Sequence, residues 1–126
     1  MTTSSKRVAA KFLNKRALQT APLLPKVRQQ VNAELRAKGF DGHILFQRPG
    51  QILSVAFDAL KKYGITLSRA ANANDFLRES GNLRLDVEFI NEADPFSPVP
   101  VGNSDFFLQY TRLEETGRYE VIGYLS

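Results

Sequence analysis

Alternation of apolar and polar side chains is clearest near the end of the chain. In residues 105–113 and 118–125, Phe, Tyr, Val, Ile and Thr recur with the two-residue period of a β-strand. The connection between these segments contains Gly117, which supplies the positive φ that a short hairpin loop needs. The pattern predicts a C-terminal β-hairpin. Because an isolated hairpin is marginal in water, further strands and a covering layer are expected.

Residues 83–90 form the most regular strand pattern in the chain, with apolar and charged side chains alternating. One buried and one solvated face are typical of a strand in an antiparallel sheet. Residues 40–47 and 65–67 are predicted to be further extended segments. Three prolines within residues 92–104 exclude a helix and a central strand there, so we expect an extended loop of a length that is often functional.

Apolar residues at helical spacing predict helices elsewhere. Residues 51–63 carry a broad apolar face and are followed by a glycine that favours helix termination. A helix that starts at Pro25 and ends at Gly39 is also predicted, since proline suits the first helical position and glycine the residue after the last. An amphipathic helix is expected to end near residue 19, and a short helix is expected at 75–79.

Together these elements predict an α+β fold in which two or three N-terminal helices pack on one face of an antiparallel sheet of three to four strands, with the hairpin at its C-terminal half. The 126 residues suffice for a single domain, residues 1–126. Within it we distinguish a basic helical arm, 1–38, from an acidic α+β body, 39–126. No apolar run reaches the ~20 residues that span a bilayer, so no membrane span is expected.

Charge separates these two parts. Residues 1–38 hold nine Lys or Arg side chains and a single acidic one, a net charge of +8, whereas residues 39–126 have a net charge of −4. Within the first predicted helix, Arg7, Lys11 and Lys15 follow one another at i, i+4 spacing beside an apolar stripe that includes Val8 and Phe12. Such polarity predicts a polyanion or an acidic protein surface as partner.

The first functional hypothesis is a small nucleic-acid-binding accessory protein that contacts phosphates without sequence specificity. The contacting residues would be Lys6, Arg7, Lys11, Lys15, Arg16, Lys26, Arg28 and Arg36. No nucleic-acid-binding motif accompanies them, and a solvated face that aids solubility explains the same charge. The acid-free composition of residues 1–21 also suits a mitochondrial presequence.

The alternative hypothesis is a structural or assembly protein, for example of a virus, in which the basic arm of one copy meets the acidic body of another. Phe96, Val99 and Val101 lie in the proline-rich segment and are predicted to form a partner-docking loop. The other reading is that Phe96 folds back onto its own domain. This hypothesis implies a homo-oligomer.

Other chemistry finds little support. The chain has no cysteine and a single histidine, His43, so neither a transition-metal site nor a cysteine nucleophile is expected. Asp86 and Glu88 share one face of a strand, with Asp94 nearby in the sequence, and two or three carboxylates can hold Mg²⁺ or Ca²⁺. Alternating charge on the solvated face of a sheet, with Arg84 as a neighbour, explains these residues without a metal and is the interpretation that we favour. No phosphate-binding glycine motif or hydrolase motif is present, which argues against an enzyme. We predict no catalytic residues, no metal and no cofactor, and a cytoplasmic location, or a virion-associated one for a viral protein.

Aromatic side chains concentrate in the predicted hairpin. Those considered are Phe106, Phe107, Tyr110, Tyr119 and Tyr124. Aromatic residues on a sheet stack on bases in some RNA-binding domains. We expect these to form core or a subunit interface instead, because they alternate as core residues do and no Lys/Arg cluster accompanies them on the sheet.

Overall fold

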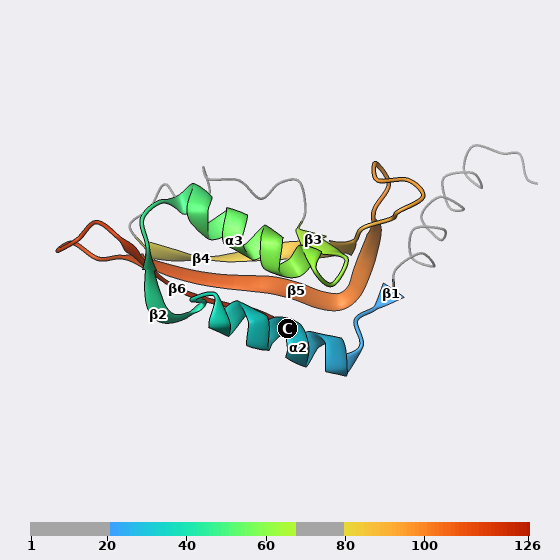
Figure 1. Ribbon diagram of the computed structural model, residues 1–126, viewed down its shortest axis with the longest axis horizontal. Coiled ribbons are helices and arrows are strands. Elements are labelled where there is room, and N and C mark those ends of the chain that lie inside the picture. Colours follow the sequence, from blue (N-terminus) through green and yellow to red (C-terminus); the bar gives the residue numbers. More distant parts are fainter. Residues whose placement is uncertain (1–20, 68–79) are drawn as a thin grey trace, which may run out of the picture.

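The computed structural model describes residues 21–67 and 80–126, which form helices and strands (Figure 1). In chain order the elements are β1 (Ala21–Pro22), α2 (Pro25–Ala37), β2 (Asp41–Phe46), α3 (Pro49–Lys61), β3 (Ile65–Leu67), β4 (Ser80–Phe89), β5 (Val99–Arg112) and β6 (Tyr119–Leu125). The helices predicted before residue 20 and at 75–79 lie outside the described residues.

The six strands form a sheet in the order β2-β6-β5-β4-β3, with β1 pairing in parallel to one end of β5 and all other pairs antiparallel. β5 bends sharply where its register with β4 shifts (Figure 1). Asp86 lies opposite Asp105, but Glu88, two residues on, lies opposite Pro100. The extra residues in β5 include Asn103, which has a φ of 61°. Beyond this bulge β5 leaves β6 and pairs with β1, so the sheet curls.

The predicted architecture, N-terminal helices on a sheet of three to four strands, is wrong. The described chain holds both helices and strands, but it is a six-stranded sheet curled into a half-barrel with two short helices. One helix, α3, lies between β2 and β3 in the sequence and is not N-terminal. β5 begins at Val99, inside the segment whose prolines predicted a loop, and this first part of β5 supplies the residues that pair with β1. Pro100 is tolerated because it precedes the two β5 residues that pair with β1, so it needs ladder partners on one side only.

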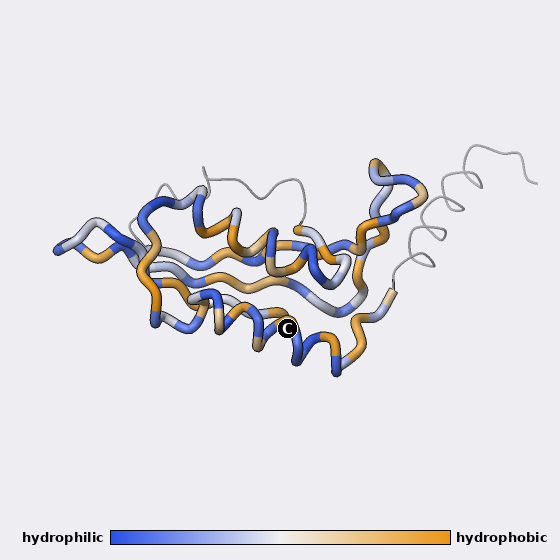
Figure 2. The backbone as a smooth tube through the Cα atoms, in the orientation of Figure 1, coloured by the Kyte–Doolittle hydropathy of each residue, from blue (hydrophilic) through white to orange (hydrophobic). Residues whose placement is uncertain are grey.

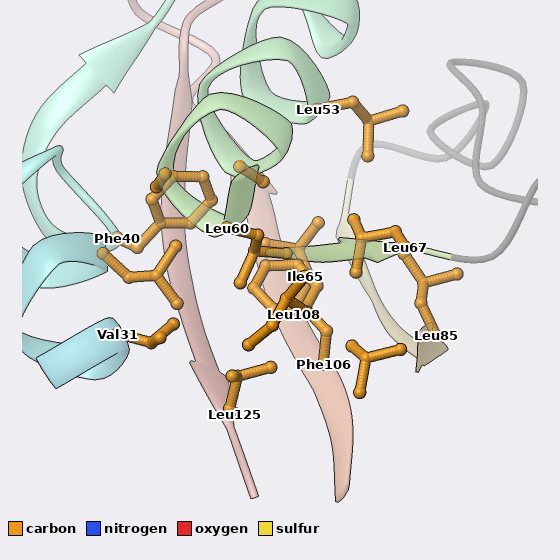
Figure 3. Packing of buried hydrophobic residues seen from close by; sticks show 14 of the residues in the cluster. Val31, Phe40, Leu53, Leu60, Ile65, Leu67, Leu85, Phe106, Leu108 and Leu125 are labelled. Carbon is orange, nitrogen blue, oxygen red and sulfur yellow. The ribbon is translucent and has the colours of Figure 1, made fainter. Parts of the chain in front are cut away.

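Both helices lie on the concave face of the sheet and bury their apolar stripes against it (Figures 1 and 2). Val31 and Leu35 of α2 are fully buried, although the sequence assigned this helix to a basic arm. Figure 3 shows how side chains of both helices meet those of the sheet. The largest fully buried side chains are Phe40, Phe106, Leu35, Ile52, Leu60, Ile65, Leu108 and Leu125. Burial of such side chains against a common sheet is the main stabilising term of the fold.

Asn32 of α2 completes the hydrogen bonding of β6. Its Nδ2 donates to the Leu125 carbonyl at 2.9 Å, and its Oδ1 accepts from the Leu125 N–H at 2.7 Å. Leu125 lies beyond the residues of β6 that pair with β2, so the amide of Asn32 occupies the place of a neighbouring strand. Helical spacing alone puts this residue in line with Arg28 at i−4 and Arg36 at i+4, on a polar ridge, whereas the side chain is part of the helix–sheet contact.

Close packing also requires a glycine in β6. A Cβ atom on Gly123 would lie 2.6 Å from Cδ1 of Phe40 and 3.2 Å from Cζ of Phe106. These distances are shorter than van der Waals contact, so the glycine is what lets the two rings approach the strand. The rings themselves pack edge to face, with centroids 6.2 Å apart.

Candidate interaction surface

The convex face of the sheet is covered by no helix or loop of the described chain. We call it the open sheet face and define it by the outward-pointing residues of β4, β5 and β6. These residues are Asn82, Arg84, Asp86, Glu88, Asp105, Phe107, Gln109, Thr111, Glu120, Ile122 and Tyr124. They alternate with core residues such as Leu85, Phe106 and Val121, which is how the pleat assigns them to the opposite face.

An aromatic pair lies at the centre of the open sheet face. Phe107 and Tyr124 are opposite one another on β5 and β6, and their rings are stacked with centroids 5.5 Å apart at an interplanar angle of 21°. Ile122 is the neighbour of Tyr124 on the same face, and these two side chains are 40% and 48% exposed. An apolar group of this kind on a solvated sheet is typical of a contact surface when polar residues surround it.

Arg84 extends this group toward β4. It lies opposite Phe107 in the register, and its guanidinium carbon is 5.5 Å from the centroid of the Phe107 ring, a cation–π contact. Asp105 fixes the guanidinium, because its Oδ2 accepts from Nε at 2.9 Å and from Nη2 at 2.7 Å. Tyr124, Phe107 and Arg84 therefore form a continuous row across three strands.

Carboxylates surround this row. Asp86, Glu88 and Glu120 form no ion pair with any residue in the described ranges. Asp41 lies opposite Ile122 at the edge of the same face. Its pKa is held below the ordinary value by the hydrogen bonds that it accepts from His43, so this carboxylate stays ionised to lower pH. With Arg84 neutralised by Asp105, the face carries a net negative charge.

The basic residues predicted on α2 do not converge on one surface. Lys26 and Arg36 are exposed, while Arg28 is half-buried, and its Nε is buried without a hydrogen-bond partner among the described residues. Residues that are two positions apart in an α-helix differ by about 200° in direction, so Lys26 and Arg28 point to nearly opposite sides of α2. The remaining predicted phosphate-binding residues are Lys6, Arg7, Lys11, Lys15 and Arg16, all outside the described residues.

The predicted docking loop is divided by the fold. Val99 and Val101 belong to β5, and Val101 is a core residue that is 8% exposed. Phe96 is 82% exposed on the loop between β4 and β5. Asn91 and Asp94 hold that loop, since Oδ1 of Asn91 accepts from the Ala93 N–H at 3.0 Å and Oδ1 of Asp94 from the Phe96 N–H at 3.1 Å. Phe96 is therefore presented to solvent alone, without the two valines.

Sequence reasoning considered the hairpin aromatics and Arg84 but did not join them into one surface. The alternation that predicted the strands also assigns Phe107 and Tyr124 to the face opposite Phe106 and Tyr110. What the pattern does not provide is the register that puts Arg84, Phe107 and Tyr124 in one row, because register depends on the bulge in β5.

Other candidate sites gain little from the geometry. Within residues 21–67 and 80–126, no group of three or more His, Asp or Glu side chains is arranged to hold a metal ion. His43 is exposed and hydrogen-bonds to Asp41. None of the helices in these ranges is long and apolar enough to cross a membrane. Comparisons with protein-family models, with curated proteins and with solved structures find no match to this chain.

Proposed function

We propose that this chain is a structural or assembly protein and that its open sheet face is a contact surface between protein subunits. The observation that carries the proposal is the stacked pair of half-buried Phe107 and exposed Tyr124, on a sheet face that no described element covers. Aromatic side chains of this kind are enriched at protein–protein interfaces, where they bury a large area with few rotatable bonds.

The charge of the face defines the kind of partner. The three carboxylates Asp86, Glu88 and Glu120 lie around the aromatic row without ion-pair partners in the described part of the chain. A nucleic acid would be repelled by this arrangement, because its phosphates carry the same sign of charge. A basic protein segment with apolar side chains matches both the charge and the aromatic centre.

Self-association measured by sedimentation velocity tests the proposal. Replacing Phe107 and Tyr124 together by threonine removes both rings while keeping a residue type that favours strands. We expect the double variant to lose most of the concentration-dependent association of the native chain. A Gln109→Thr variant, changed on the same face beside the pair, is the control and should associate normally. Equal association of native and double-variant chains would refute the proposal.

The second candidate function is sequence-independent binding of nucleic acid by the basic arm, residues 1–38. The exposed, unpaired side chains of Lys26 and Arg36 favour it, since neither forms an ion pair with a described residue. Fluorescence anisotropy with labelled single-stranded and duplex DNA and RNA over a salt series tests this function. Affinity that falls steeply with salt, and less steeply after Lys26→Gln and Arg36→Gln, would support it.

A further inference from the structure

We propose that the open sheet face of one copy binds residues 1–20 of a neighbouring copy, so that copies associate head to tail. This inference rests on the proposed function and names the occupant of the contact surface. Four observations carry it: the charges of the two parts, the match of their spacings, the fit of their apolar side chains, and the direction in which the chain enters β1.

The charges of the two parts are complementary. Residues 1–20 contain five Lys or Arg side chains and no acidic residue. The open sheet face presents Asp86, Glu88 and Glu120 without ion-pair partners among the described residues, and its one arginine is already paired with Asp105. Association of these surfaces brings opposite charges together, which favours both the encounter and its orientation.

The spacing of the basic ridge also matches that of the carboxylates. In a helix, as the sequence predicts for this segment, residues at i and i+4 such as Arg7 and Lys11 are separated by about 6 Å along the axis. Asp86 and Glu88 point to the same side of β4 and are separated by about 7 Å along the strand. Consecutive basic side chains therefore meet consecutive carboxylates. The like-charge repulsion that an isolated helix of this sequence carries is relieved in the contact.

The apolar parts of the two surfaces fit one another as well. The basic ridge of residues 1–20 is flanked by a stripe that includes Val8 and Phe12. On the sheet, the carboxylates flank Phe107, Ile122 and Tyr124. A segment that lays its charged ridge over the carboxylates places its apolar stripe on the aromatic centre, which is the way an amphipathic helix docks on a protein surface.

The direction of β1 assigns the contact to a neighbouring copy. β1 runs parallel to β5, with Ala21 opposite Val101 and Pro22 opposite Gly102. The chain therefore approaches β1 from the Val99 end of β5, which is remote from Phe107. Twenty residues reach about 30 Å as a helix, enough to extend to a second molecule.

Such a contact is heterologous, because the two copies contribute different surfaces. Each molecule then offers one free segment and one free face, so growth continues until a ring closes or a filament forms. Association should increase with protein concentration and weaken with added salt, since exposed charges contribute to it.

A charge-swap experiment on the full chain tests the inference. One variant reverses the segment, with Arg7→Glu, Lys11→Glu and Lys15→Glu. The other reverses the face, with Asp86→Lys, Glu88→Lys and Glu120→Lys. Each variant alone should associate at least about tenfold more weakly than the native chain, because the attraction between opposite charges across the contact becomes repulsion between like charges. Mixing the two variants should restore the mass seen by sedimentation velocity, because each then complements the other.

Several results would overturn the inference. If the segment variant associates as the native chain does while the Phe107→Thr, Tyr124→Thr chain does not, the sheet face is a contact surface but residues 1–20 are not its occupant. If both charge variants lose association and the mixture stays monomeric, the two surfaces do not bind one another. A native chain that is monomeric at all concentrations contradicts this inference and the proposed function together. The segment variant changes no described residue, so its result stands even if the face variant does not fold.

Discussion

Removing the side-chain amide of Asn32 should destabilise the protein well beyond what a polar residue on a helix surface normally contributes. In Asn32→Ala, the outward-facing N–H and C=O of Leu125 lose the bonds of 2.7 and 2.9 Å that the amide makes with them. Leaving a partly buried backbone group without a partner costs ~1–2 kcal/mol, and the better helix propensity of alanine returns ~0.5 kcal/mol. Because two such groups lose their partner, the free energy of unfolding should fall by about 1.5–3.5 kcal/mol.

Urea denaturation followed by far-UV circular dichroism measures this loss. The midpoint should shift without a change in slope, because the surface exposed on unfolding is nearly the same. Gln30→Ala is the matched control, since this glutamine is exposed on the same helix and its replacement should change stability by no more than about 0.5 kcal/mol. If Asn32→Ala is as stable as the control, the amide does not replace a strand at the end of β6.

Asn32→Asp adds a pH dependence to this test. The aspartate keeps the acceptor for the Leu125 N–H but, when ionised, faces the Leu125 carbonyl without a proton to donate. The protonated acid restores the donor, so we expect the folded-state pKa of this carboxyl to be raised above its unfolded value. The variant should then be closest to the native chain in acid and lose stability as the pH rises through that raised pKa.

The remaining predictions concern packing, acid stability and the exposed loop. Gly123→Ala should lower the free energy of unfolding by about 1–3 kcal/mol, because the added methyl group has no room. Gly50→Ala lies at a helical position where an added Cβ has no atom within 4 Å, and it should raise the free energy of unfolding by about 0.5 kcal/mol. Urea denaturation measures both changes. The hydrogen bond from Lys62 lowers the pKa of Glu34. The stabilisation that this bond gives is therefore present above the ordinary pKa of 4.5 and is lost as the pH falls through the lowered pKa. In Glu34→Gln, this loss of stability should be absent from the acid-denaturation curve. Phe96→Ser should change stability by less than about 0.5 kcal/mol because the ring is 82% exposed, and a larger loss would mean that the ring packs on its own domain.

Local patterns predicted the individual elements well. The helix expected at 51–63 is α3, Pro49–Lys61, and the strand expected at 83–90 is β4, Ser80–Phe89. The second arm of the expected hairpin is β6, Tyr119–Leu125. Period and turn residues are properties of short segments, so sequence alone identifies these elements and the face that each one buries.

Long-range features were not predicted. The first part of β5 was not predicted, because the prolines before residue 104 favour a loop. A proline is compatible with a strand only where its nitrogen needs no partner in the sheet, as at an edge. Leu24 fits the apolar spacing of α2 but is 64% exposed at the N-cap, while Leu23 is buried in its place. The helical position of Asn32 predicts a surface residue, and its role comes only from the contact with Leu125, 93 residues away in the sequence. Each of these features depends on contacts between elements that are distant in the sequence, which a local pattern does not specify.

The candidate surface was predicted only in its components. The net charges of the two parts of the chain follow from counting residues, and they suggested the contact between copies. Placing Arg84, Phe107 and Tyr124 in one row on the open sheet face required the register across three strands. Lys26 and Arg28 form no joint basic surface, because residues two positions apart on a helix point in nearly opposite directions.

Disulfide trapping between single-cysteine copies tests the central claim most directly, because the native chain has no cysteine to confuse the result. One copy carries Phe12→Cys and the other Ile122→Cys, and the two are mixed under mild oxidation. A disulfide needs Cβ atoms within about 4.5 Å, so only a docked segment can form it readily. We predict that the mixed disulfide forms faster than either homodimer and faster than with a control copy carrying Gln51→Cys, an exposed position on α3. Equal rates for Ile122→Cys and Gln51→Cys would contradict binding of the N-terminal segment to the open sheet face.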